Sequence, residues 1–200
     1  FQAVIAMDPR SNEAELAANL ILDTLNITKN WESLKQTSKV FFDQAGLGSE
    51  KFKKDVYVIY RNASFKLIEV NFEKDKDFGK AADGFVAFAN EFPDADITPQ
   101  ALNNAATYYN KSSRIADSMK VRHILVDDPR FAAKTKYYYD QVGFLGYDYE
   151  TIADYEMAAS IYERLWSLTP AETKKPENAA RVAEFDKKAG DAIYTAAVFR

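Results

Sequence analysis

The sequence predicts an all-α fold built from antiparallel helical hairpins. The first observation behind this prediction is an internal repeat, in which large apolar and small residues recur at the three- and four-residue steps of a helix and end at a proline. The second is composition, because 47% hydrophobic and 28% charged residues with 7 Gly and 6 Pro are typical of a folded soluble chain. Since proline cannot continue a helix, each repeat unit is expected to contain a helix that stops at its proline.

Three copies of the unit share this order, and the second copy is degenerate. They are Phe78, Ala81, Ala82, Phe85, Phe88, Pro93; Arg114, Asp117, Ser118, Val121, Ile124, Pro129; and Tyr155, Ala158, Ala159, Tyr162, Leu165, Pro170. Small residues opposite large ones allow two helices to approach closely while aromatic rings fill the space between hairpins. The residues expected to be almost fully buried are Phe85, Tyr162, Ala81, Ala158, Gly146 and Tyr149.

The whole chain, 1–200, is expected to form a single helical-repeat array, interpreted as a fragment of a longer protein because it opens without an initiator Met. The predicted hairpins cover about 11–45, 49–92, 98–128 and 131–169, and a last helix covers 177–200. Within them, the segment Lys134–Tyr139 is expected to extend the helix that ends near Glu150, and Glu177 is expected to begin the last helix.

A β-hairpin is the alternative for one segment of the N-terminal third. Residues Val56–Tyr60 and Phe65–Phe72 are rich in strand-forming residues and flank four residues that would make a turn. However, an apolar stripe with helical period runs unbroken through this supposed turn. We therefore predict one long helix from Ser49 to about Glu73.

The C-terminal half resembles the tetratricopeptide repeat (TPR) superfamily position by position. The residues that carry the resemblance are Val142, Leu145, Gly146 and Tyr149, followed by Tyr155, Ala158, Tyr162, Leu165 and Pro170. The resemblance covers Phe65 to Pro170 well, and the irregular repeat lengths are similar to those of bacterial cell-envelope proteins such as outer-membrane assembly and motility scaffolds.

This resemblance implies a TPR-like right-handed solenoid that acts as a non-catalytic protein–protein interaction scaffold. It also suggests a location in the periplasm or cell envelope. Two other hypotheses stay open: a structural spacer module of a larger protein, and an all-helical enzyme that acts through Tyr and Lys residues.

Catalytic and metal chemistry find little support in the sequence. The chain has no Cys, and its one histidine, His123, is the only possible base for a Ser–His–Asp arrangement. We therefore predict no catalytic residue, no metal site and no cofactor. A net charge of −4 disfavours nucleic acid as a partner, and no apolar run reaches the roughly 20 residues of a membrane-spanning helix.

Two local features point to a protein or peptide ligand. The basic one could attract an acidic partner, and its alternative interpretation is a merely solvated surface. Seven basic residues against three acidic ones lie between Lys111 and Lys136, and a run of three tyrosines, 137–139, cannot turn to one side of a helix. The TPR frame adds two positions expected to line a groove, Leu102 and Asn103. The predicted protein-binding residues are Tyr109, Lys134, Lys136, Tyr138, Tyr147, Leu102 and Asn103.

Overall fold

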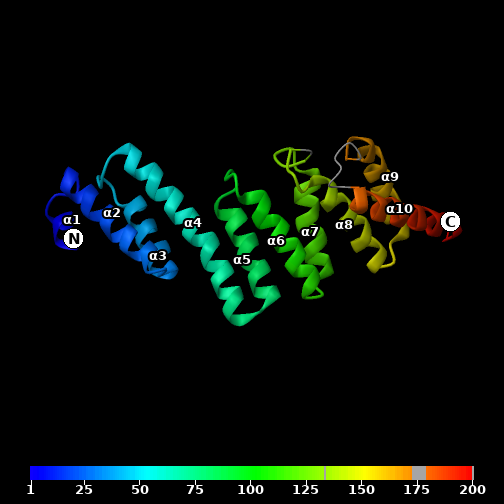
Figure 1. Ribbon diagram of the computed structural model, residues 1–200, viewed down its shortest axis with the longest axis horizontal. Coiled ribbons are helices and arrows are strands. Elements are labelled where there is room, and N and C mark those ends of the chain that lie inside the picture. The colour runs from blue at the N-terminus through cyan, green and yellow to red at the C-terminus, as the bar shows by residue number, and fades with distance from the viewer. Residues whose placement is uncertain (133, 173–178, 200) are drawn as a thin grey trace. The chain divides into compact units, whose positions relative to one another are not determined.

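The computed structural model describes residues 1–132, 134–172 and 179–199, and within these ranges the regular structure consists of ten α-helices and no strand (Figure 1). The all-α prediction is confirmed. The chain forms two compact units, residues 1–77 and residues 78–200. The arrangement of the whole chain as a single array stays a prediction.

Unit 1 contains α1 (Gln2–Met7), α2 (Asn12–Ile27), α3 (Trp31–Asp43) and α4 (Glu50–Asp75). Helices α2 and α4 begin where the sequence predicts, because the hydroxyl of Ser11 accepts the amide of Ala14 and that of Ser49 accepts the amide of Phe52. Helix α4 packs on α3 and is continuous through residues 61–64. The helix prediction for this segment is therefore confirmed, and the β-hairpin alternative is wrong.

The end of α3 is held by a lysine from α4. The Lys53 ammonium donates to the carbonyl oxygens of Phe41 (2.6 Å), Phe42 (2.8 Å) and Gln44 (2.6 Å). These carbonyls lie in the last turn of α3 and just beyond it, where helices lack internal donors. Partial burial lowers the pKa of Lys53, and the charges of Asp43 and Glu50 oppose this shift.

Unit 2 contains α5 (Phe78–Glu91), α6 (Thr98–Lys111), α7 (Ile115–Asp127), α8 (Tyr138–Thr151), α9 (Tyr155–Glu172) and α10 (Ala179–Phe199). Each of these helices packs against the next one along the chain, as the ribbon in Figure 1 shows. Neighbours in sequence are thus neighbours in space.

The core of unit 2 depends on two glycines of α8. A Cβ atom added to Gly146 would lie 2.7 Å from Cε1 of Tyr162, and one added to Gly143 would lie 2.4 Å from Cε1 of Phe185. Both rings are buried, with exposed fractions of 0% and 3%. The absence of a side chain at these glycines therefore lets α9 and α10 place aromatic rings directly against the backbone of α8.

The burial prediction is confirmed for Phe85, Tyr162, Ala81, Ala158 and Gly146. It is wrong for Tyr149, which is only half-buried. The Tyr149 hydroxyl lies 2.9 Å from Nε2 of His123, and this partner holds the end of the side chain at the edge of the core.

A backbone turn recurs at four helix ends. The residue that follows α2, α4, α6 or α8 by one or two positions has a positive φ: 55° at Lys29, 54° at Lys76, 60° at Ser113 and 60° at Ala153. At three of these turns the next amide donates across 2.9 Å to the carbonyl five residues earlier, in the pairs Asn30 to Leu25, Arg114 to Tyr109 and Asp154 to Tyr149. This is the Schellman hydrogen bond, and it makes the internal repeat visible in the backbone.

The helix boundaries correct the sequence prediction at two places. Residues 134–137 precede α8 instead of extending it, because the chain forms turns there. The amide of Lys134 donates to the carbonyl of Phe131 at 3.0 Å, and that of Tyr138 donates to the carbonyl of Thr135 at 3.2 Å. Helix α9 continues to Glu172, so the predicted stop at Pro170 is wrong. The predicted helix start at Glu177 lies outside the described residues. The predicted hairpin 49–92 spans both units and stays a prediction.

The close contact of Gly146 with the Tyr162 ring predicts that Gly146→Ala destabilises the protein by about 1–3 kcal/mol, because a buried ring must move to accept the methyl group. Urea unfolding measures the change. Gly190→Ala is the matched control, since a Cβ at Gly190 meets nothing within 4 Å and should stabilise α10 by about 0.5–1 kcal/mol. Equal effects of the two substitutions would contradict the packing argument.

The positive φ of Ser113 predicts that Ser113→Gly stabilises the protein by about 0.5–1 kcal/mol, because glycine adopts the left-handed conformation without the steric cost of a Cβ. Ser112→Gly is the matched control, since Ser112 has φ −93° and gains nothing from glycine. Thermal unfolding of both variants checks the difference, and a loss of stability in Ser113→Gly would refute it.

Candidate functional site

A solvent-open groove of about 210 Å³ lies over four helices of unit 2. Its lining residues are Thr107, Asn110 and Lys111 of α6, Arg122 of α7, Phe144 and Tyr147 of α8, and Lys188 of α10. Two of them are large aromatic side chains that remain exposed, Phe144 at 40% and Tyr147 at 45%.

The helical period explains why α8 supplies both rings. Phe144 and Tyr147 are three residues apart and so share one face of the helix, while Leu145 and Gly146 between them are buried. The Phe144 ring meets the Phe185 ring edge to face, with centroids 5.6 Å apart. The Lys188 ammonium lies 4.9 Å from the centroid of the Tyr147 ring. Helix α10 thus supports both rings from one side.

One lining residue of the groove, Arg122, belongs to a buried ion pair. Arg122 and Asp148 have side-chain exposures of 4% and 0%, and Nε of Arg122 donates to Oδ2 of Asp148 at 2.7 Å. The same guanidinium donates through Nη1 to Oε1 of Gln141 at 2.5 Å and lies 5.0 Å from the centre of the Phe144 ring. Burial lowers the pKa of Arg122 and Asp148 opposes this, but a guanidinium beside a carboxylate stays charged at neutral pH.

Polar side chains from three helices complete the hydrogen bonding of this ion pair. Asp148 also accepts from Asn110 Nδ2 (3.0 Å) and from Ser118 Oγ (3.1 Å). Gln141 Nε2 donates to Asn103 Oδ1 at 2.8 Å. The network therefore joins α6, α7 and α8 at a depth where an unpaired polar group would be costly.

The basic segment predicted between Lys111 and Lys136 is largely neutralised in the structure. Arg114 pairs with Asp83 and Asp117, Lys120 pairs with Asp117, and Arg130 pairs with Asp128. Arg122 is buried with Asp148. Asp83 and Asp148 lie outside the segment in sequence, so a count of charges along the chain overstates its positive charge. It does not form one continuous cationic surface.

The predicted binding residues fall into different environments. Leu102 and Tyr109 are buried, with exposures of 3% and 5%, so little of either side chain is open to a partner. The Tyr109 hydroxyl donates to Asp83 Oδ1 at 2.7 Å, and burial together with this bond raises the pKa of Tyr109 to about 12. Asn103 is half-buried in the polar network.

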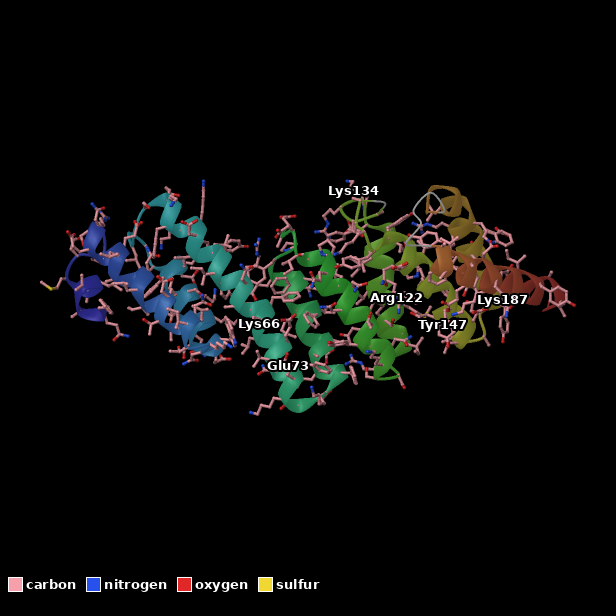
Figure 2. The ribbon with its side chains drawn as sticks, viewed as in Figure 1. Lys66, Glu73, Arg122, Lys134, Tyr147 and Lys187 are labelled. Atoms are coloured by element: carbon pink, nitrogen blue, oxygen red, sulfur yellow. The ribbon has the colours of Figure 1, made fainter. Side chains whose placement is uncertain are left out.

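The remaining predicted residues do not form a single surface. Lys134 and Lys136 are exposed in the turns before α8, where Lys134 donates to the carbonyl of Pro129. Tyr138 is half-buried and accepts from Arg164. Tyr147 lies nine residues further along α8, which is roughly 13 Å along a helix axis, and Figure 2 shows it well apart from Lys134. Of the seven, only Tyr147 lines the groove over the ion pair.

The predicted binding residues do not include the lining residues Thr107, Asn110, Phe144 and Lys188, and the sequence did not identify Asp148 as the partner of Arg122. The position of Arg122 gave no signal of its burial, because it is outside the six positions of the repeat unit and directly follows the core residue Val121, about 100° further around the helix.

His123 lies outside the groove and ties three helices together. Its Nδ1 is 2.7 Å from Oδ2 of Asp127, and its Nε2 is 2.9 Å from the Tyr149 hydroxyl. Arg164 of α9 donates to the other oxygen of Asp127 at 2.7 Å. Both ring nitrogens therefore already have partners within the protein.

Three comparisons with known proteins give no relative: no family model, no curated protein and no solved structure matches this chain. Among the described residues, no helix is long and apolar enough to cross a membrane, and no group of three or more His, Asp or Glu side chains is placed to hold a metal ion.

The buried ion pair predicts a strong coupling between its two residues. Asp148→Ala should cost about 3–5 kcal/mol, because it leaves the Arg122 charge buried without its partner. The double variant Arg122→Met, Asp148→Ala should lose much less than the sum of the single variants. Asp55→Ala, which removes the exposed Lys51–Asp55 pair, is the matched control and should cost less than about 0.5 kcal/mol.

A double-mutant cycle from urea unfolding measures this coupling. Additive effects of the two substitutions, or a loss of unfolding free energy below about 1 kcal/mol for Asp148→Ala, would show that the ion pair does not hold the helices of unit 2 together.

Proposed function

We propose that this chain is a non-catalytic protein–protein interaction scaffold, in which TPR-like helical hairpins stack as a right-handed solenoid. The observation that carries the proposal is the groove of unit 2, where Phe144 and Tyr147 remain exposed above the buried Arg122–Asp148 pair. Aromatic side chains on a rigid support are typical of interface residues that contribute most of the binding energy.

The backbone supports the repeat part of the proposal. The Schellman hydrogen bond with the same five-residue offset ends α2, α6 and α8, and every helix of unit 2 packs on its sequence neighbour. Repeat proteins build their cores in this way, through contacts between consecutive units, and they use the side chains of successive helices to bind extended partners. The resemblance to repeats of bacterial envelope proteins extends the proposal to a periplasmic or cell-envelope assembly or motility complex.

The polar network fixes the relative positions of the three helices α6, α7 and α8, which contribute to the groove. Asn110, Arg122 and Asp148 come from these three helices and share their hydrogen bonds, so the helices are held together before a partner arrives. A preformed site loses less conformational entropy on binding than a flexible one.

A pull-down from an extract of the source organism tests the proposal. Tyr147→Ala should reduce recovery of specifically bound proteins about tenfold or more, as expected for removal of a large interface aromatic. Tyr194→Ala is the matched control, because Tyr194 is 73% exposed on α10 and does not line the groove. Circular dichroism should show that both variants keep their helices.

Two results would count against the proposal. Equal recovery of the same proteins by both variants would remove the groove as the binding site. Failure of the wild-type chain to enrich any protein over the matrix would reject the scaffold function and favour the structural spacer hypothesis.

A further inference from the structure

The described side chains that line the groove include three cations and no carboxylate. The cationic members are Lys111, Arg122 and Lys188. Two of them have an acidic neighbour, because Arg122 pairs with Asp148 and the Lys188 ammonium lies 3.0 Å from Glu184. An anion in the groove would therefore be attracted chiefly by the third cation, Lys111.

Lys111 is exposed, and aromatic rings hold its ammonium group. The nitrogen lies 5.3 Å from the centroid of the Phe78 ring and 6.0 Å from that of Tyr108. No carboxylate of a described residue forms an ion pair with it. Lys188 is placed in a similar way over the Tyr147 ring, at 4.9 Å. Both lysines line the groove, but the rings next to the Lys111 ammonium lie outside its lining, whereas Tyr147, next to the Lys188 ammonium, lies within it. Each ammonium group has three donors, so both keep hydrogen-bonding capacity for a ligand.

The dimensions of the groove favour a side chain of a protein partner over a separate small molecule. Its volume of about 210 Å³ lies below the roughly 300–1,000 Å³ of pockets that hold drug-sized ligands. The exposed faces of Phe144 and Tyr147 provide apolar area next to the two lysines. Two neighbouring residues of a peptide, one apolar and one acidic, could therefore contact the rings and the lysines of the same groove.

We propose that the groove binds a short peptide segment in which an acidic residue is adjacent to an aromatic or large aliphatic residue. The carboxylate contacts the ammonium groups of Lys111 and Lys188, and the apolar side chain packs on Phe144 and Tyr147. This inference rests on the proposed interaction function and specifies the chemistry of its partner. It also explains how an acidic molecule with a net charge of −4 can attract an acidic segment, because the attraction is local to the groove.

Selection from a random heptapeptide library displayed on phage tests this inference while the natural partner is still unidentified. Peptides enriched by the wild-type chain should contain Glu or Asp next to Phe, Tyr, Trp, Leu or Ile. A fluorescein-labelled synthetic copy of an enriched peptide then serves as the probe for fluorescence anisotropy. Replacing its acidic residue by the corresponding amide should weaken binding about fivefold or more and flatten the dependence on salt.

Two pairs of variants separate contacts in the groove from general effects. Lys188→Gln should weaken binding of the probe about threefold or more, while Lys187→Gln should leave it nearly unchanged. Lys187, labelled in Figure 2, directly precedes Lys188 on α10 and is exposed. It is not among the residues that line the groove. Tyr147→Ala should weaken binding about tenfold, while Tyr194→Ala should not. Lys111→Gln should weaken binding at least as strongly as Lys188→Gln, because no carboxylate of a described residue pairs with Lys111, whereas Lys188 is paired with Glu184.

The possible outcomes distinguish this inference from the proposed function. Enriched peptides without acidic residues, or equal effects of Lys188→Gln and Lys187→Gln, would overturn the inference; the scaffold function would stand if the peptides still bind. A library that yields no enriched peptide would count against both. Binding that responds to Tyr147 but not to Lys111 or Lys188 would reject the carboxylate contact and keep the apolar one.

Discussion

The buried pair of Arg122 and Asp148 is the interaction on which the arrangement of unit 2 depends. Moving two opposite charges out of water costs several kcal/mol for each ion, and their attraction offsets this cost only if every remaining hydrogen-bonding group is satisfied. In this protein the partners come from α6, α7 and α8. The three helices must therefore meet in one register, because a shift of one helix by a residue would leave a buried charge unpaired.

This constraint also explains the character of the groove above it. An apolar core packs in several ways at small cost, whereas a directional network accepts one. The Phe144 ring lies 5.0 Å from the guanidinium of Arg122, and the Tyr147 ring, on the same face of α8, contacts Lys188 of α10. The groove is consequently a fixed surface with exposed apolar area, and not a gap left by loose packing.

The sequence predicts the helices well because their signals are local. The hydroxyls of Ser11 and Ser49 cap the helices that follow them, so these residues mark helix starts in the sequence. The apolar stripe through residues 61–64 is also recognisable from the sequence without tertiary information. The site is different. The carboxylate that neutralises Arg122 lies 26 residues away in sequence, and Asp83 lies 31 residues before Arg114. A count of nearby charges cannot anticipate such partners, which is why the basic segment looked more cationic than it is.

The same distinction applies to aromatic residues. Tyr109 and Tyr147 have equal hydrophobicity in the sequence, but one is buried and bonded to Asp83 while the other is exposed. Whether each side chain points to the core or to solvent depends on how its helix is rotated relative to the neighbouring helices. A shift of one residue in the predicted register changes this rotation by about 100°. The prediction was correct where small residues fixed the phase, as at Gly146 and Ala158.

The contact between Gly146 and Tyr162 has an evolutionary consequence. Neither position is free to change alone, because a larger residue on α8 meets the ring and a smaller residue on α9 leaves a void against a bare backbone. Homologues should therefore exchange the two together, either keeping a glycine opposite an aromatic residue or pairing alanine with a smaller side chain. The same covariation is expected between Gly143 and Phe185. Two positions of α8 that are three residues apart should therefore covary with two different helices, α9 and α10.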